Sequence, residues 1–501
     1  MPMTKAVLRT AAERPDLVAV AGGGDQLTYS ELAETSRRTI AAVDALHAAQ
    51  AHPPAAAPET GGIPVTAVSI DSAFHAARIV ASLAGYRAVS AVIDPRWPLE
   101  HRIRVIESTG IGLVVSDSAE LAPALQQRGW GGTVISLADF VGAEGSAAAA
   151  TAPTVRDGDE AFLMLFSSGT TSDPKAFLKT RAQYRANVAV SSAYLEPLPG
   201  VATLAPGPLS YSLTLYAVIE CLATGGTVHV ADRFDAIDAG RRIERESITR
   251  IVAVPAILQA LAVAARRSPE RFASLSVLVT GGANLPASIR QAAAETIPDA
   301  RLISYYGAAE IGFIGDSRDG DGTSIGVYEG IAVEVRDDAG AAVADGELGE
   351  LWVLADACSD GYLSGTTDEV LQGEGGWATV HDQARVVDGR LELVGRAGDI
   401  AITGGHKVAL TEVERVFEGV AGVDAACAVA LPDRALGSAV ALVIEGSATK
   451  PSLQAVAAER LAPQFVPLRW YRVSELARTV GGKVRRHAVA ALVADGGGER
   501  L

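Results

Sequence analysis

The apolar positions in the first half of the chain form short runs separated by helical patterns. Residues 65–70, 89–93 and 111–116 are strand-like, and an amphipathic helix is predicted between the first two runs. An earlier helix is expected to begin near residue 28, with Thr28 or Ser30 as its cap. Strands that alternate with helices favour a parallel sheet covered by helices. The pattern therefore predicts an α/β fold.

The second half contains two nearly all-apolar runs followed by shorter, more polar strands. Residues 251–255 and 275–280 have the composition of central parallel strands, which are buried on both faces. Residues 325–353 predict a run of strands with turns at Asp337–Gly340 and Asp345–Gly346. The C-terminal remainder predicts a compact α+β arrangement: a helix, strands at 425–431 and 439–445, a helix from 452, a strand at 468–473 and a final helix.

Composition narrows the classes of protein that fit. The chain has 501 residues, so two or more domains are expected, and no apolar run has membrane-spanning length. A net charge of −16 argues against nucleic acid or an anionic membrane as a partner. The N-terminus lacks a signal-peptide pattern, and three dispersed cysteines in apolar contexts indicate neither a disulfide framework nor a metal cluster. We therefore expect a cytoplasmic globular enzyme.

Lysine is scarce in this chain. Only six lysines accompany 37 arginines, so each one raises the question of what a primary ammonium does at its position. The six are Lys5, Lys175, Lys179, Lys407, Lys450 and Lys483.

The stretch from Leu163 to Ala176 carries the strongest chemical signal. An apolar strand-like run ends in small and hydroxylated residues, followed by Asp-Pro-Lys175. Hydroxyls and backbone N–H groups on a turn, with one lysine, suit a polyphosphate. The spacing from Gly169 to Lys175 is not that of a Walker loop, and Ala176 stands where Ser or Thr would hold magnesium. A polar turn after a core strand is the alternative reading.

Two later strands also end in candidate ligand contacts. Gly281–Gly282 follows one of the apolar runs, where a flat ligand can approach the backbone closely. The next strand ends at Tyr306, and Glu310 follows shortly after it. Alone, each has an ordinary reading, because Gly-Gly turns are common and a glutamate after a strand is usually solvated.

Together these segments resemble the AMP-forming adenylating superfamily, which includes acyl-CoA synthetases, peptide-synthetase adenylation domains and luciferases. Residues 166–176 keep the family's phosphate-loop pattern except at Ser172 and Ala176, where glycine is usual. Five further segments follow in family order: Gly281–Pro286, Tyr306–Glu310, Trp377–Asp382, Gly395–Glu414 and the turn that carries Lys483. Ala309 replaces a family threonine, and Ser210–Tyr211 replaces an aromatic-His pair.

The resemblance implies a role for each matching residue. Lys483, Glu310, Thr170 and Lys175 would be catalytic, and Glu310 would hold Mg²⁺. Tyr306 would stack on adenine, Asp382 would bind the ribose hydroxyls and Gly398 would be a hinge. Gly404 and Gly405 would line a CoA tunnel, and Ser210 and Tyr211 would line the acyl pocket. The residues implied to contact ATP or AMP are Ser167, Ser168, Gly169, Thr170, Thr171, Lys175, Gly281, Gly282, Ala283, Tyr305, Tyr306, Gly307, Asp382 and Arg396.

The implied fold is a large α/β domain over residues 1–395 with mostly parallel sheets, and a small mobile α+β domain over 396–501. The implied reaction uses ATP and Mg²⁺ to convert a small-molecule carboxylic acid into an acyl-adenylate, releasing pyrophosphate. Transfer to coenzyme A would then give a thioester.

One alternative is an enzyme that loads the phosphopantetheine arm of a carrier protein. Another is a binding protein that keeps the fold without turnover. The acid itself, whether fatty, aryl or polycyclic, is not readable.

Overall fold

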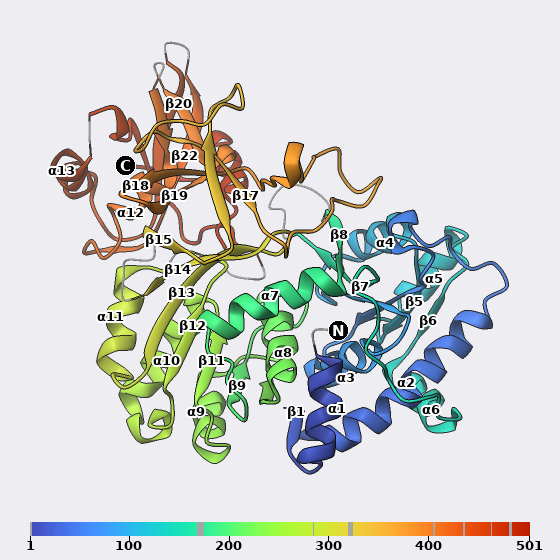
Figure 1. Cartoon of the computed structure of the whole chain (residues 1–501). Coiled ribbons are helices and arrows are strands. Elements are labelled where there is room, and N and C mark those ends of the chain that lie inside the picture. Colours follow the sequence, from blue (N-terminus) through green and yellow to red (C-terminus); the bar gives the residue numbers. More distant parts are fainter. Residues whose placement is uncertain are drawn as a thin grey trace. The chain divides into compact units, whose positions relative to one another are not determined.

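A computed structural model of the whole chain describes residues 3–167, 175–283, 285–318, 324–403, 406–433, 436–461, 463–479 and 483–501. It divides into two compact units (Figure 1). The first comprises residues 1–282, 293–315 and 354–378, and the second comprises 283–292, 316–353 and 379–501. The chain passes from the first unit to the second inside strand β14 (Gly312–Arg318). The domain boundary at residue 395/396 stays a prediction.

One sheet of the first unit carries the flanks of the predicted phosphate loop. Its strands lie in the order β6-β5-β3-β4-β7-β8 and are parallel, except that β8 runs antiparallel to β7. The strands are β3 (Val65–Ser69), β4 (Val89–Val92), β5 (Ile111–Ser116), β6 (Thr133–Ile135), β7 (Ala161–Phe166) and β8 (Ala176–Thr180). Its neighbouring helices in the chain are α2 (Tyr29–Ala48), α3 (Ala73–Leu83), α4 (Leu99–Ser108), α5 (Leu121–Gln127) and α6 (Leu137–Ser146). The three predicted strands are confirmed.

The predicted cap of α2 is also confirmed. The hydroxyl of Thr28 accepts a hydrogen bond from the Glu31 N–H, and the Glu31 carboxylate accepts one from the Thr28 N–H, at 3.2 and 2.8 Å. This reciprocal capping box satisfies two donors that the first helical turn leaves without intrahelical partners.

A second set of strands in the first unit lies in the order β2-β1-β10-β9-β11-β12-β13. Neighbours from β1 to β13 pair in parallel, and β2 is antiparallel to β1. The two runs predicted as central strands are confirmed, because β11 and β12 are buried along their whole length. The strands are β1 (Val18–Gly22), β2 (Asp25–Thr28), β9 (Ala202–Ala205), β10 (Thr227–Val230), β11 (Arg250–Ala253), β12 (Val277–Thr280) and β13 (Arg301–Ala308).

Helix α8 (Ser212–Thr224) is the most deeply buried helix among those of this region. It contacts strands β9, β10 and β11 as well as helices α1, α3 and α7, and most of its side chains are buried. A helix that is apolar all round requires such enclosure. The other helices here are α1 (Thr4–Glu13), α7 (Arg181–Tyr194), α9 (Ala236–Arg245) and α10 (Pro255–Arg267), and α11 (Ala287–Thr296) begins in the second unit and ends in the first.

The second unit contains a set of strands in the order β16-β17-β18-β19-β15, in which the neighbours from β17 to β15 pair antiparallel. The predicted run of strands over 325–353 is confirmed, and the chain returns to the same set after residue 379. The strands are β15 (Ser324–Val327), β16 (Ala332–Arg336), β17 (Gly349–Leu354), β18 (Asp382–Val387) and β19 (Arg390–Arg396).

The C-terminal part of this unit has its own sheet and its own core. Strands β21-β20-β23-β24-β25 are neighbours in that order, and β22 pairs with β23. One apolar cluster is centred on Phe417 and Trp470 and another on Cys427 and Val489. The elements are β20 (Ile400–Thr403), β21 (His406–Ala409), β22 (Val423–Asp433), β23 (Gly437–Gly446), β24 (Arg469–Arg472), β25 (Glu499–Arg500), α12 (Leu410–Arg415), α13 (Lys450–Arg460) and α14 (Arg486–Ala494). The α/β fold class and the small α+β C-terminal arrangement are confirmed.

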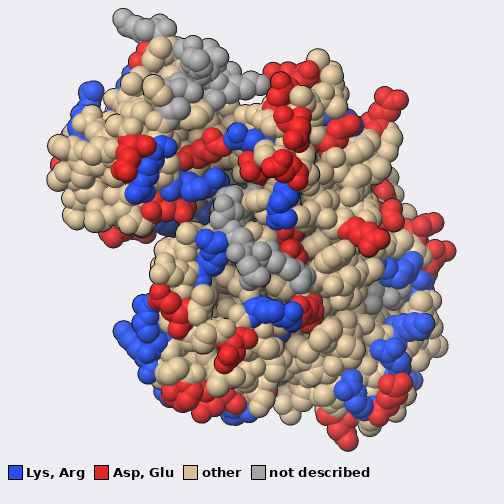
Figure 2. Space-filling model, turned by 60° about the vertical axis from the view of Figure 1, so that its left-hand side comes forward, with Lys and Arg blue, Asp and Glu red and all other residues tan. Residues whose placement is uncertain are grey.

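Five short 3₁₀ helices complete the described elements: η1 (Pro58–Thr60), η2 (Pro269–Phe272), η3 (Glu374–Gly376), η4 (Ala397–Asp399) and η5 (Pro463–Phe465). None of the helices in the described ranges is both long and apolar enough to cross a bilayer. On the face shown in Figure 2, acidic and basic side chains are interspersed.

Candidate active site

Strands β7 and β8 bring the two ends of the predicted phosphate loop together. Phe166 pairs with Ala176, and the Ser167 N–H donates a hydrogen bond to the Lys175 carbonyl at 2.9 Å. The buried Ser167 hydroxyl has no hydrogen-bond partner in the structure as described. An unsatisfied hydroxyl at this position suits a phosphate oxygen. The predicted contacts at Ser168, Gly169, Thr170 and Thr171 lie outside the described residues.

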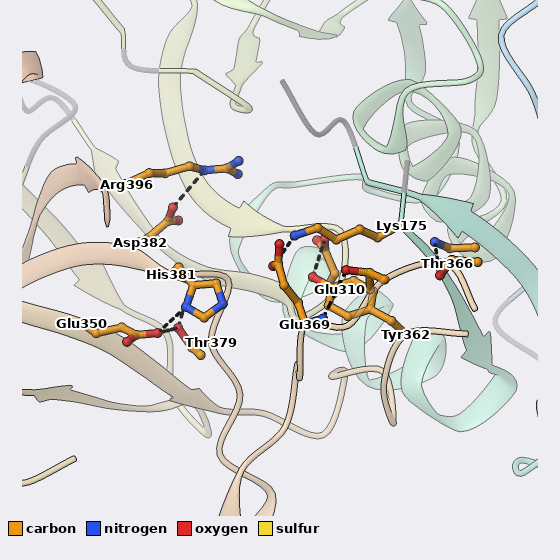
Figure 3. Close-up of polar contacts among 12 residues, drawn as sticks. Lys175, Glu310, Glu350, Tyr362, Thr366, Glu369, Thr379, His381, Asp382 and Arg396 are labelled. Atoms are coloured by element: carbon orange, nitrogen blue, oxygen red, sulfur yellow. Dashed lines mark hydrogen bonds and ion pairs between the residues drawn. The ribbon is translucent and has the colours of Figure 1, made fainter. Parts of the chain in front are cut away.

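Lys175 is held by two groups from the segment after residue 360. Its ammonium forms an ion pair with Glu369 and lies 5.4 Å from the centre of the Tyr362 ring (Figure 3). The same segment contacts the start of β8, where the Thr366 hydroxyl accepts a hydrogen bond from the Ala176 N–H at 3.3 Å. Lys175 is therefore fixed between a carboxylate and an aromatic face.

Glu310 lies in the turn after β13 and joins the same group of residues. It is only 7% exposed, and the Tyr362 hydroxyl lies 3.3 Å from its Oε1 atom (Figure 3). Tyr362 thus connects the two predicted site residues Lys175 and Glu310. No group of three or more His, Cys, Asp or Glu side chains that could hold a metal occurs in the described ranges. A lone carboxylate fits Mg²⁺, which takes its other ligands from phosphates and water.

The adenine-side residues sit at the ends of β12 and β13. A Cβ atom on Gly281 would lie 2.5 Å from Cε1 of Tyr305, so this position requires glycine. Gly282 has a φ of +77°, which also favours glycine. The Tyr305 ring makes an edge contact with Phe313, with ring centres 4.7 Å apart. Because successive strand residues point to opposite faces, Tyr306 lies on the face of β13 opposite Tyr305.

Gly307 occupies a second close approach on β13, and Ala283 follows the Gly281–Gly282 turn. A Cβ atom on Gly307 would lie 3.2 Å from the Phe313 Cα, closer than side chains normally come. Ala283 and Gly307 therefore lie at the ends of consecutive strands, where the sequence predicts the adenine-side contacts.

The predicted acyl-pocket residues are tied to a segment to which the sequence assigned no chemistry. The Ser210 hydroxyl donates to Asp94 Oδ2 at 3.1 Å, and Arg96 donates to both carboxylate oxygens of Asp94 at 2.8 and 2.6 Å. Burial opposes ionisation, yet the bonds from Arg96 hold the pKa of Asp94 below its usual value. Tyr211 precedes α8, and burial raises its pKa.

In the second unit, the predicted ribose contact Asp382 and the predicted ribose or phosphate contact Arg396 are neighbours. Asp382 and Arg396 pair across β18 and β19, and Arg396 Nε donates to Asp382 Oδ1 at 3.2 Å (Figure 3). His381, which precedes Asp382, has a φ of +63°, in the region that glycine favours. Its Nδ1 atom lies 2.7 Å from Glu350 Oε1, and its backbone N–H donates to the Thr379 hydroxyl at 2.9 Å. The backbone shape that glycine favours is thus kept by a histidine.

Lys483 and Gly398 lie in the C-terminal part of the second unit. Lys483 is exposed, and its N–H donates to the Thr479 hydroxyl at 3.2 Å. Gly398 lies in η4, where nothing stands within 4 Å of a Cβ position. The next residue, Asp399, accepts a 2.6 Å hydrogen bond from Arg486 at the start of α14. The predicted tunnel residues Gly404 and Gly405 lie outside the described residues.

Sequence reasoning missed several contributors to these clusters. Tyr362 and Glu369 gave no distinctive signal, because each touches a site residue far along the chain, and the segment that begins at Asp94 resembled the family but was assigned no chemistry. Lys179 was visible only as one of six scarce lysines. His229 is buried in β10 with 4% exposure. All three cysteines are buried as well.

Comparison with known proteins identifies the family. Residues 7–363 match the model of the AMP-binding enzyme family. The chain is 30% identical over 417 residues to the uncharacterized acyl-CoA ligase YhfT of Bacillus subtilis, covering 82% of this chain and 83% of that protein. It is 26% identical over 525 residues to the fatty acid–[acyl-carrier-protein] ligase MmaC of Mycobacterium marinum, covering 97% and 96%.

The fold agrees with a solved structure as well. ATP-bound MatB from Rhodopseudomonas palustris matches with a TM-score of 0.87 at 20% identity, over 99% of this chain and 100% of that one. The predicted class, an AMP-forming acid–thiol ligase, is confirmed by the family match and the named ligases. The chain belongs to the AMP-binding enzyme family.

Proposed function

We propose that this chain uses Mg²⁺ and ATP to convert a carboxylic acid into an acyl-adenylate and then transfers the acyl group to coenzyme A. The observation that carries the proposal is the connected cluster of Lys175, Tyr362 and Glu310, which lies where β7 and β8 bring the two ends of the phosphate loop together. It combines one cation for phosphate oxygens with one carboxylate for a metal. This cluster lies in a chain that belongs to the AMP-binding family.

In the first step, a carboxylate oxygen of the acid attacks the α-phosphorus of ATP, and the bond to the pyrophosphate oxygen breaks. Lys175 neutralises negative charge on the phosphate oxygens, and the Ser167 hydroxyl donates a hydrogen bond to one of them. Glu310 would hold the metal. When bound, Mg²⁺ offsets the negative charge of the phosphates. Lys483 pairs with the incoming carboxylate and the α-phosphate, which a compact ammonium on a long side chain suits.

In the second step, the sulfur of the thiol attacks the acyl carbon, the carbon–oxygen bond to AMP breaks, and the thiol proton passes to solvent. No side-chain nucleophile is needed, because the adenylate already supplies a good leaving group. Asp382 and Arg396 keep the AMP portion in place through its ribose, Tyr306 stacks on adenine, and Gly398 permits the rotation between steps.

The acid is the least determined substrate. The hydrogen bond between Ser210 and Asp94 fixes one edge of the acyl segment, but it favours no class of acid. The test is therefore carboxylate-dependent ATP–pyrophosphate exchange over a panel of medium- and long-chain fatty, aryl and polycyclic acids. Exchange with one class would establish adenylation and name the substrate class. If ATP binds but no acid supports exchange, a melting-temperature shift with acyl-sulfamoyl adenosines separates an acid outside the panel from a protein without turnover.

The thiol acceptor is a separate question, because one similar protein is named as a ligase for an acyl-carrier protein. With the active acid in hand, the rate of thioester formation is measured with coenzyme A and with a phosphopantetheinylated carrier protein. We expect coenzyme A to be the better acceptor. A clear preference for the carrier protein would reverse the assignment.

A further inference from the structure

Lys179 is the one lysine that the described structure encloses completely. It lies in β8, four residues after the predicted phosphate-binding Lys175, and is 2% exposed. In a chain with 37 arginines and six lysines, an ammonium at such a position calls for a physical explanation.

The Lys179 ammonium joins two distant segments through their backbones. Nζ donates to the carbonyl of Glu310 at 2.7 Å and to the carbonyl of Ala357 at 2.6 Å. The Glu310 carbonyl also accepts a hydrogen bond from the Ser359 N–H at 2.8 Å. One cation therefore holds the turn of Glu310 against the segment that leads to Tyr362.

The same two segments meet again at the Glu310 side chain. Tyr362 places its hydroxyl 3.3 Å from Glu310 Oε1, and the Tyr362 ring lies beside Lys175 (Figure 3). The Glu310 backbone is thus held by Lys179 on the buried side, and its carboxylate by Tyr362 on the other. All of these residues belong to the first unit.

Moving an ammonium out of water costs several kcal/mol, and a hydrocarbon side chain of similar length would avoid that cost only by leaving the carbonyls of Glu310 and Ala357 without this donor. Burial lowers the pKa of Lys179 to about 8, although Cys358, Glu310 and Asp360 favour the charged form.

We propose that Lys179 and Tyr362 are positioning residues that fix the Glu310 carboxylate for Mg²⁺. This inference rests on the proposed function, in which Glu310 is the metal ligand. Loss of either residue leaves the carboxylate present but poorly placed. The requirement for Mg²⁺ then rises, whereas binding of the acid does not change.

The test compares the variants Lys179→Met, Lys179→Gln and Tyr362→Phe with the wild type. Glu310→Gln is the reference, and Lys5→Met, on the exposed face of α1, is the matched control. Three quantities are measured: the Mg²⁺ concentration for half-maximal pyrophosphate release, the KM for the acid, and the melting-temperature shift caused by Mg²⁺ with ATP relative to ATP with EDTA.

We expect Lys179→Met and Lys179→Gln to raise the half-activating Mg²⁺ concentration by about 10- to 100-fold, as loss of outer-shell partners does at metal sites. Tyr362→Phe should raise it by a smaller factor. Both changes should reduce the metal-dependent melting shift and leave the KM for the acid unchanged. Lys5→Met should match the wild type. If both lysine variants fail to fold, Tyr362→Phe decides the test, because it leaves the buried ammonium in place.

An unchanged Mg²⁺ requirement in folded Lys179 variants, alongside a raised one in Glu310→Gln, would overturn the inference and leave the proposed function standing. If Glu310→Gln instead has the same half-activating Mg²⁺ concentration as the wild type, Glu310 is not the metal ligand. That result would overturn the inference together with this part of the proposed function.

Discussion

The two units hold their predicted site residues in different ways. In the first unit, the predicted metal ligand Glu310 is 7% exposed and is held by Tyr362 and by Lys179, a residue that was not predicted as part of the site and is 2% exposed. In the second unit, Lys483 is exposed and the Arg396 side chain is 56% exposed. Burial fixes geometry at a cost in desolvation, whereas exposure leaves a side chain free to change partners.

This difference matches the division of labour in the proposed reaction. A metal and its phosphates need ligands fixed before substrate arrives, and multiple contacts from packed segments supply that. A lysine that meets the acid only during adenylation needs reach rather than fixation. Substitutions in the first unit should therefore disturb stability and activity together, whereas substitutions in the second should separate them.

The largest effect is expected for Lys483→Ala. Adenylation, measured by ATP–pyrophosphate exchange, should fall by about 10²- to 10³-fold because a preorganised charge at the reacting centre is lost. Thioester formation from supplied acyl-adenylate should persist, and the melting temperature should stay the same because the side chain is exposed. Arg485→Ala, which removes a positive charge from an exposed residue nearby, is the control. Equal loss of both half-reactions would refute the assigned role.

The next effect concerns His229, which is buried in the first unit. Burial, with Arg242 and Arg245 nearby and Glu246 opposing them, lowers its pKa to about 4. The unfolded chain binds a proton at this histidine below about pH 6.5, but the folded chain does so only below about pH 4. Stability should therefore fall as the pH drops from 6.5 to 4, by up to roughly 3 kcal/mol from this group.

Denaturant unfolding of the wild type and of His229→Gln, each followed from pH 7.5 to 4.5, measures that contribution. The variant can differ from the wild type at pH 7.5, but the difference should shift in favour of the variant as the pH falls. A difference that does not vary with pH would show that folding does not lower the pKa of His229.

Gly281→Ala should lower the free energy of unfolding by about 1–3 kcal/mol, because the new methyl group would overlap the Tyr305 ring. Displacement of Tyr305 should also raise the KM for ATP. Gly398→Ala in the second unit should leave stability nearly unchanged, since nothing lies within 4 Å of its Cβ position. Gly142→Ala in α6, which also has open space, controls for the substitution itself. Equal melting temperatures for Gly281→Ala and Gly398→Ala in thermal unfolding would contradict the closer packing around Gly281.

The sequence predicted the elements and the order of the site residues better than it predicted their partners. The cap at Thr28 and the apolar strands β11 and β12 depend on neighbouring residues, so a local pattern identifies them. The contact between Lys179 and Glu310 spans 131 positions, and the ion pair between Lys175 and Glu369 spans 194. No periodicity connects such residues, because only the packing of separate segments brings them together.

The return of the chain after the phosphate loop was not predicted either. The loop leads into β8, which runs antiparallel to β7, rather than directly into a helix. The run of residues 176–180 is short and includes Lys179, which is buried although a charged residue is normally expected at the surface. A buried lysine therefore weakens the apolar signal of the strand in which it lies.

The smallest effect is expected for Asp382→Asn, and it tests the second unit most directly. The amide keeps the size of the carboxylate but loses its charge and one acceptor oxygen, so the KM for ATP should rise by about fivefold, or ~1 kcal/mol. The melting temperature should change little, because the Arg396 side chain is 56% exposed and an ion pair with one solvated partner stabilises a protein only weakly. Asp388→Asn, at the exposed turn between β18 and β19, is the matched control. A destabilised Asp382→Asn with normal ATP affinity would make this pair a structural contact and would end the contrast between the two units.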